Sequence, residues 1–238
     1  LNDSDRLVSS VTKENVTSPA NLKEDLLAVR ELRNKYDNLH VDIEPRANQV
    51  ALDQQGAQFQ KTLRIDDKLL DGAVINGVTV DKNEPLIRDL LNYAKAKYGN
   101  LPPELRAEAY TRFAKTAFQE NSEGIANVYV RNYRNITGGK NPYLGDFAKL
   151  NSGVCFEESL FLKLLGDQHS DWQVSLVGGI SSNSDGFKVA NNTNPKLNHA
   201  WTEFKFKSTD TPRIYDPRQV VIGETYDEML ARMGTAHV

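Results

Sequence analysis

The chain has very little cysteine: Cys155 is the only one in 238 residues. A single thiol cannot close an intrachain disulfide, and it excludes zinc and iron–sulfur sites that need several cysteine ligands. A lone cysteine is compatible with a reducing compartment, and with any compartment if the thiol is used in chemistry.

Basic blocks, long apolar runs and calcium-binding patterns are also missing. The 29 basic and 32 acidic residues are interspersed and give a net charge of −3, so we expect no nucleic-acid partner. No apolar run reaches the length that spans a bilayer, and no signal-peptide pattern is visible. No acidic cluster has the spacing of a calcium loop, so we expect neither a metal nor a cofactor.

The compartment and the oligomeric state stay open at this level. A mean hydropathy of −0.54 is polar for a compact protein, so we expect part of the chain to be a solvated arm or loop. Because the sequence begins with Leu1 rather than methionine, we expect a piece of a longer chain. Its polar N-terminal region is compatible with a domain of a secreted or translocated protein, and a cytoplasmic protein is equally compatible.

The first 150 residues predict helices and one hairpin. Apolar residues at helical spacing predict a helix over residues 21–36, with Asn21 as its N-cap. The pair Asn76-Gly77 lies between short β-branched stretches and predicts a two-residue hairpin turn. Prolines at first-turn positions start two further helices, at Pro85 and Pro103. The segments without periodicity, where we expect an arm and long connections, are 1–20, 37–60 and 124–150.

The second half predicts a helix followed by a sheet. Residues 155–165 form an apolar segment too hydrophobic on all sides for a surface helix, so we expect a central helix. Alternating patterns then predict strands over 172–180, 199–207 and 213–216, with a polar loop over 181–198 and a closing helix over 226–233. The predicted fold class is α+β, with the central helix packed on an antiparallel sheet.

Three side chains of this half form a candidate catalytic set. Cys155 begins the central helix. His199 begins the predicted strand 199–207, and Asp216 ends the predicted strand 213–216. The positive end of a helix favours a thiolate, a histidine can take and return its proton, and a carboxylate can orient the imidazole. The intervals of 44 and 17 residues allow the three groups to meet, with His199 and Asp216 abreast on neighbouring antiparallel strands.

The residues around the cysteine favour the same chemistry. Ser152-Gly153 lets the backbone turn sharply into the helix, and the backbone N–H of Cys155 is a candidate donor to an oxyanion. Asn151 and Asn198 flank the candidate residues and are weaker candidates for the same role.

Simpler interpretations exist for each member of the set. Cys155 taken alone is typical of a small buried hydrophobic residue. Asp216 can cap a turn before Pro217, and Asp210 and Asp227 are weaker candidates for the orienting carboxylate. The combination of three residues in this order favours the catalytic interpretation.

The motifs carrying these residues resemble a known family. Gly-x-Cys at residues 153–155, His-Ala-Trp at 199–201 and Tyr-Asp-Pro at 215–217 resemble the transglutaminase-like superfamily of papain-type folds, over residues 145–220. The resemblance implies Cys155 as nucleophile, His199 as base and Asp216 as orienter. One departure is that Phe156 is followed by Glu157-Glu158 rather than small apolar residues, and these acids oppose a thiolate electrostatically.

The resemblance implies an enzyme that acts on protein or peptide amides through a thioester, with transglutaminase or glutamine deamidase chemistry foremost. The alternatives are a cysteine peptidase on the same triad and a non-catalytic binding domain of the same fold. An arylamine acetyltransferase role uses the same three residue types, but nothing else in the chain favours it. We expect an N-terminal appendage over residues 1–80 and the transglutaminase-like domain over 81–238.

Overall fold

The computed structural model describes residues 15–36, 64–75, 77–118, 141–151, 153–182, 186–189 and 199–235. Within these ranges the protein is a mixed α+β structure, which confirms the predicted class. Its helices are α1 (Pro19–Lys35), α3 (Pro85–Tyr98), α4 (Pro103–Phe118), α6 (Leu144–Leu150), α7 (Cys155–Gly166) and α8 (Tyr226–Thr235). Its strands are β1 (Arg64–Ile65), β2 (Ala73–Ile75), β3 (Val78–Val80), β4 (Trp172–Ser182), β5 (Gly186–Val189), β6 (His199–Phe206), β7 (Arg213–Asp216) and β8 (Val221–Glu224).

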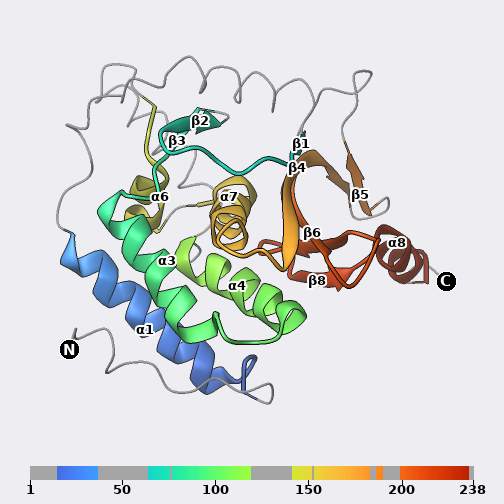
Figure 1. The fold of residues 1–238 in the computed structure, drawn as a ribbon, viewed down its shortest axis with the longest axis horizontal. Helices are drawn as coiled ribbons and strands as arrows, with labels where there is room; N and C mark the ends of the chain where they lie inside the picture. The colour runs from blue at the N-terminus through green and yellow to red at the C-terminus, as the bar shows by residue number, and fades with distance from the viewer. Residues whose placement is uncertain are drawn as a thin grey trace.

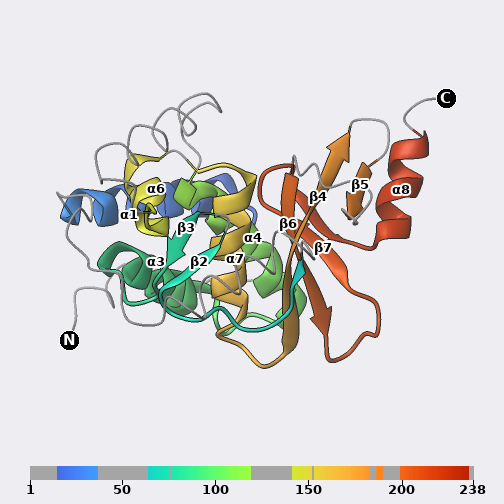
Figure 2. The ribbon, with the colours of Figure 1, turned by 90° about the horizontal axis from the view of Figure 1, so that it is seen from above.

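The main sheet has six antiparallel strands in the order β1-β4-β6-β7-β8, with β5 paired to β4. Helix α7 packs on β4 and β6, and α4 packs against α7 and also contacts β6, β7 and β8. Figures 1 and 2 show α7 between α3 and the sheet, with α8 at the far side of the sheet. The predicted arrangement of a central cysteine-bearing helix on an antiparallel sheet is therefore confirmed.

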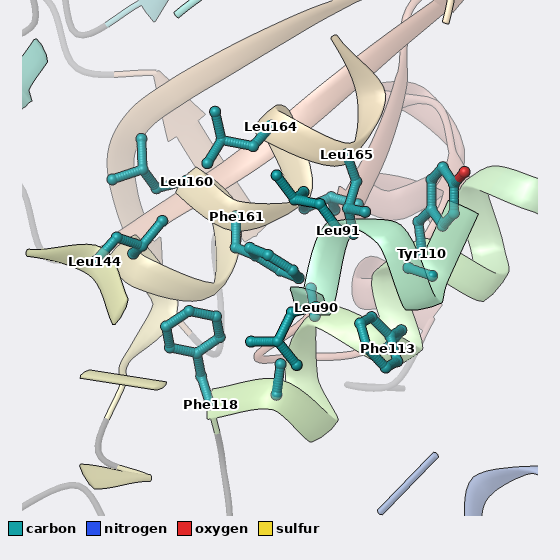
Figure 3. Close-up of a cluster of buried hydrophobic side chains, with 14 of the residues drawn as sticks. Leu90, Leu91, Tyr110, Phe113, Phe118, Leu144, Leu160, Phe161, Leu164 and Leu165 are labelled. Carbon is teal, nitrogen blue, oxygen red and sulfur yellow. The ribbon is translucent and has the colours of Figure 1, made fainter. Parts of the chain in front are cut away.

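The hydrophobic core explains why α7 is apolar on every side. Each residue from Phe156 to Gly166 is buried, because the sheet and the helices α3, α4 and α6 all pack against α7. The Phe161 ring lies 5.4 Å from Phe118 and 6.3 Å from Phe113, measured between ring centroids. Figure 3 shows this cluster, in which leucines of α3, α6 and α7 surround the Phe161 ring. The core thus fixes the direction of α7 and the place where it begins.

The predicted hairpin is present. Strands β2 and β3 pair antiparallel, with Ile75 opposite Val78. Gly77 has φ of 81°, a left-handed conformation that glycine adopts without steric cost. Asn76 lies outside the described residues.

Two local predictions differ from the structure. The N-cap of α1 is Ser18, whose Oγ accepts the N–H of Asn21 at 3.2 Å, while the Asn21 amide donates to Val16 and Tyr98. The connection expected over 124–150 contains α6 at its end, and its earlier part lies outside the described residues. Strands β1, β5 and β8 were not predicted.

Other predictions concern parts of the chain that the structure leaves undescribed. Residues 1–14 of the arm expected over 1–20, the irregular segment 37–60 and most of the loop 181–198 lie outside the described residues. Residues 15–20 were also expected to belong to that arm, but Val16 is buried and α1 begins at Pro19. The domain division at residue 80 stays a prediction. None of the helices in the described ranges combines the length and apolarity needed to cross a membrane.

Candidate active site

Cys155 is the first residue of α7 and is partly exposed. The chain reaches it in extended conformation at Val154, whose N–H donates to the Glu157 carboxylate at 2.9 Å. The preceding Gly153 donates its N–H to the carbonyl of Phe118 at 3.1 Å, and a Cβ on Gly153 would lie 2.7 Å from that phenylalanine's side chain. Only glycine permits this approach, so Gly153 positions the turn into the helix by close packing.

His199 and Asp216 come together at one end of the sheet. His199 begins β6, opposite Gly179 of β4, and Asp216 ends the neighbouring strand β7. Their side chains meet with 2.7 Å between Nε2 of His199 and Oδ2 of Asp216. Asp216 is fully buried and His199 is 7% exposed, so water screens this contact very little.

The thiol completes the cluster. Burial lowers the pKa of His199, but hydrogen bonds to Asp216 and to Cys155 outweigh it and raise the pKa to about 9. Because Asp216 occupies Nε2, Nδ1 is the ring nitrogen that remains for the thiol. The structure therefore brings together all three residues predicted from the sequence.

The simpler interpretation of Asp216 also holds. Its second oxygen, Oδ1, accepts the backbone N–H of Arg218 at 2.8 Å, so the carboxylate caps the turn after β7 as well. Both oxygens are thus held, one by the turn and one by the imidazole. Asp210 and Asp227, the weaker candidates for the carboxylate, are exposed.

An aromatic side chain covers the imidazole. The Trp201 ring stacks on His199 with 6.0 Å between centroids and an interplanar angle of 26°. Trp201 is fully buried, and its Nε1 donates to the Tyr226 hydroxyl at 3.1 Å, which in turn donates to Glu203. Nothing local in the sequence indicates the contact of Trp201 with Tyr226, because Tyr226 lies 25 residues further on.

The two acids that depart from the family pattern are buried. Burial raises the pKa of Glu157 to about 7 and the pKa of Glu158 to about 8. A large share of both groups is therefore neutral near pH 7. Their expected opposition to a thiolate at Cys155 is weaker than two full charges would give.

Asn151 supports the approach to the cysteine. It ends α6 in a left-handed conformation, with φ of 54°, and its Oδ1 accepts from Arg33 of α1 at 2.8 Å. This contact holds the turn four residues before Cys155. Ser152 and Asn198, the other flanking residues named from the sequence, lie outside the described residues.

Within the described ranges, no group of three or more histidine, cysteine, aspartate or glutamate side chains could hold a metal ion. Comparisons of the chain with protein-family models, with curated proteins and with solved structures find no match.

Proposed function

We propose that this chain is a cysteine acyl-transfer enzyme that acts on protein or peptide amides, with glutamine side chains as the foremost substrate. In this proposal it has a transglutaminase-like, papain-type fold. The observation that supports it is one cluster of thiol, imidazole and carboxylate: His199 contacts Asp216 at 2.7 Å, and the neighbouring Cys155 contributes to the raised pKa of the ring. The partial exposure of Cys155 supports it further, because a sealed thiol could not meet a substrate.

The reaction would begin at the sulfur. The thiolate of Cys155 attacks the carbonyl carbon of the glutamine amide, and the C–O electrons move onto oxygen. The backbone N–H of Cys155, at the first turn of α7, is the candidate donor to that oxyanion. When the tetrahedral species collapses, the C–N bond breaks, the His199 imidazolium gives its proton to the leaving nitrogen, and ammonia departs from a thioester.

The second half returns the enzyme to its starting state. Water or a primary amine attacks the thioester carbon, and neutral His199 takes the proton of the attacking group. The C–S bond breaks, giving glutamate or a substituted amide and a free thiolate. A pKa of His199 near 9 favours the protonated imidazole that the first half needs. Burial lowers this pKa, and the Asp216 carboxylate is the main group that raises it.

The test uses the full chain with casein as glutamine donor and a dansylated primary amine as acceptor. Release of ammonia with or without amine incorporation, absent in Cys155→Ala, would support the proposal and separate deamidation from transglutamination. Because the chain has one cysteine, a mass shift on Cys155 identifies the acyl donor directly. Peptide-bond cleavage of casein that depends on Cys155 would favour the peptidase alternative. Failure of both reactions, together with iodoacetamide labelling no faster than for free cysteine, would favour a binding domain.

A further inference from the structure

One buried carboxyl group beside the cluster has no part in the chemistry described above. Glu158 is fully buried, and its Oε1 lies 3.5 Å from Nη1 of Arg218. Its Oε2 has no hydrogen-bond partner among the described residues. The neighbouring Glu157 is explained, since it accepts the N–H of Val154 at the start of α7. Burying a carboxyl group is costly, so Glu158 calls for a role of its own.

The position of Glu158 links two elements of the site. It lies three residues after Cys155 on α7, so the two side chains share one side of the helix, one turn apart. Arg218 lies in the turn after β7, and its backbone N–H donates to Oδ1 of Asp216 at 2.8 Å. The contact between Glu158 and Arg218 therefore joins the helix that carries the thiol to the turn that carries the carboxylate.

The charges around Glu158 explain how this contact is compatible with Asp216. Arg218 and Lys115 of α4 favour an ionised Glu158, while Asp216 and Glu157 oppose it. Burial is the largest influence and, with these neighbours, raises the pKa of Glu158 to about 8. Near pH 7 the group is mostly neutral, so it contacts Arg218 without placing a second full negative charge beside the Asp216 carboxylate.

We propose that Glu158 is a positioning residue that holds Arg218, and through it the turn that keeps the Asp216 carboxylate on His199. The inference rests on the proposed function, because the Asp216 carboxylate that Glu158 helps to position is a member of the proposed triad. A slip of about 1 Å in such a group can lower a rate by about 100-fold. Loss of the Glu158 contact would therefore act on the imidazole through Arg218 and Asp216.

The experiment is an NMR titration of the His199 ring in the full chain, with kcat and KM measured alongside on a glutamine substrate. In Glu158→Leu and in Arg218→Met we expect the His199 pKa to fall by about one or more, and kcat to fall about 10- to 100-fold with little change in KM. Glu158→Gln keeps a neutral oxygen opposite Arg218 and is expected to behave nearly as the wild type. Asp25→Asn removes a buried carboxylate paired with Lys97 of α3. It is the control for a general loss of stability that does not act through Arg218.

Each outcome bears on the inference. If Glu158→Leu is folded and its His199 titrates as in the wild type, the inference is overturned. It is also overturned if Asp25→Asn lowers the His199 pKa as much as Glu158→Leu does. If Glu158→Leu fails to fold, Arg218→Met decides, since its side chain is nearer the surface. The titration needs no turnover, so a wild type without amide chemistry would defeat the proposed function while this measurement still tests the positioning.

Discussion

Replacing Asp216 by asparagine should change the protonation of His199 more than any other single change. A pKa of about 9 against the ordinary 6.5 corresponds to about 3 kcal/mol of preference for the protonated ring. Burial works against this preference, so it comes from the hydrogen bonds and charges of Asp216 and Cys155. Asparagine keeps the shape and can still meet the ring, but it removes the charge. We therefore expect the His199 pKa to fall by about 1–3 in Asp216→Asn.

The same difference predicts how stability depends on pH. Because the folded pKa is raised above the unfolded value, the stabilisation is fully present below about pH 6.5 and is lost as the pH rises through about 9. In urea titrations, the free energy of unfolding of the wild type should fall by up to about 3 kcal/mol between these pH limits because of this group. The fall should be much smaller in Asp216→Asn.

The assays are an NMR titration of the imidazole and urea unfolding at several pH values. Asp210→Asn, an exposed change of the same chemistry, is the control and should titrate as the wild type. An Asp216→Asn variant whose His199 keeps a pKa near 9 would show that the 2.7 Å contact does not govern the pKa of the ring.

Three further outcomes are expected. Glutamine-directed activity should decline as the pH rises through about 9, because His199 then loses the proton it gives to the leaving nitrogen; a pH–rate profile with no alkaline decline near 9 would contradict this. Phe161→Ala should lower the free energy of unfolding by about 3–5 kcal/mol in urea titrations, whereas Leu27→Ala, at an exposed position, should change it by less than about 0.5. Gly166→Ala should destabilise by about 1–3 kcal/mol, because its Cβ would lie 2.6 Å from Val174, and adding Val174→Ala should recover part of the loss.

The candidate site was predictable because local patterns encode each of its parts. An apolar stretch fixes α7, alternation fixes β6 and β7, and each candidate residue lies at an end of one of these elements. Element ends of an antiparallel layer meet at one edge, so the order of Cys155, His199 and Asp216 was enough to predict that they approach each other. The hairpin at Gly77 was predictable for the same reason, since its turn chemistry is contained in two residues.

The parts that were missed depend on partners far along the chain. Helix α6 has seven residues, and the N–H of Gly145 in its first turn donates to Glu84, which lies 61 residues earlier. Strand β1 has two residues and exists because β4 pairs with it. The N-cap of α1 was misplaced because Tyr98, from another helix, engages the amide of Asn21. A local pattern contains none of these contacts, so only the assembled core determines them.

Arg33 also forms hydrogen bonds with residues far along the chain, and these bonds lead to a further prediction. This buried side chain of α1 donates to the carbonyl of Ala148 at 2.7 Å, to that of Ala117 at 2.8 Å, and to Oδ1 of Asn151 at 2.8 Å. Its charge thus lies at the C-terminal ends of α4 and α6, where helix dipoles favour a cation. Arg33→Met keeps the stem but removes three charge-assisted hydrogen bonds, so we expect a loss of at least about 3 kcal/mol.

The effect should also reach the thiol, because Asn151 ends α6 four residues before Cys155. Looser packing of that turn should change the rate of iodoacetamide labelling at Cys155, in a chain where no other cysteine competes. Arg30→Met, an exposed change on the same helix, is the matched control and should alter neither stability nor labelling appreciably. If Arg33→Met unfolds at the same urea concentration as Arg30→Met, the three contacts carry no net stabilisation, and α1 would not be needed to hold the chain that leads to the thiol.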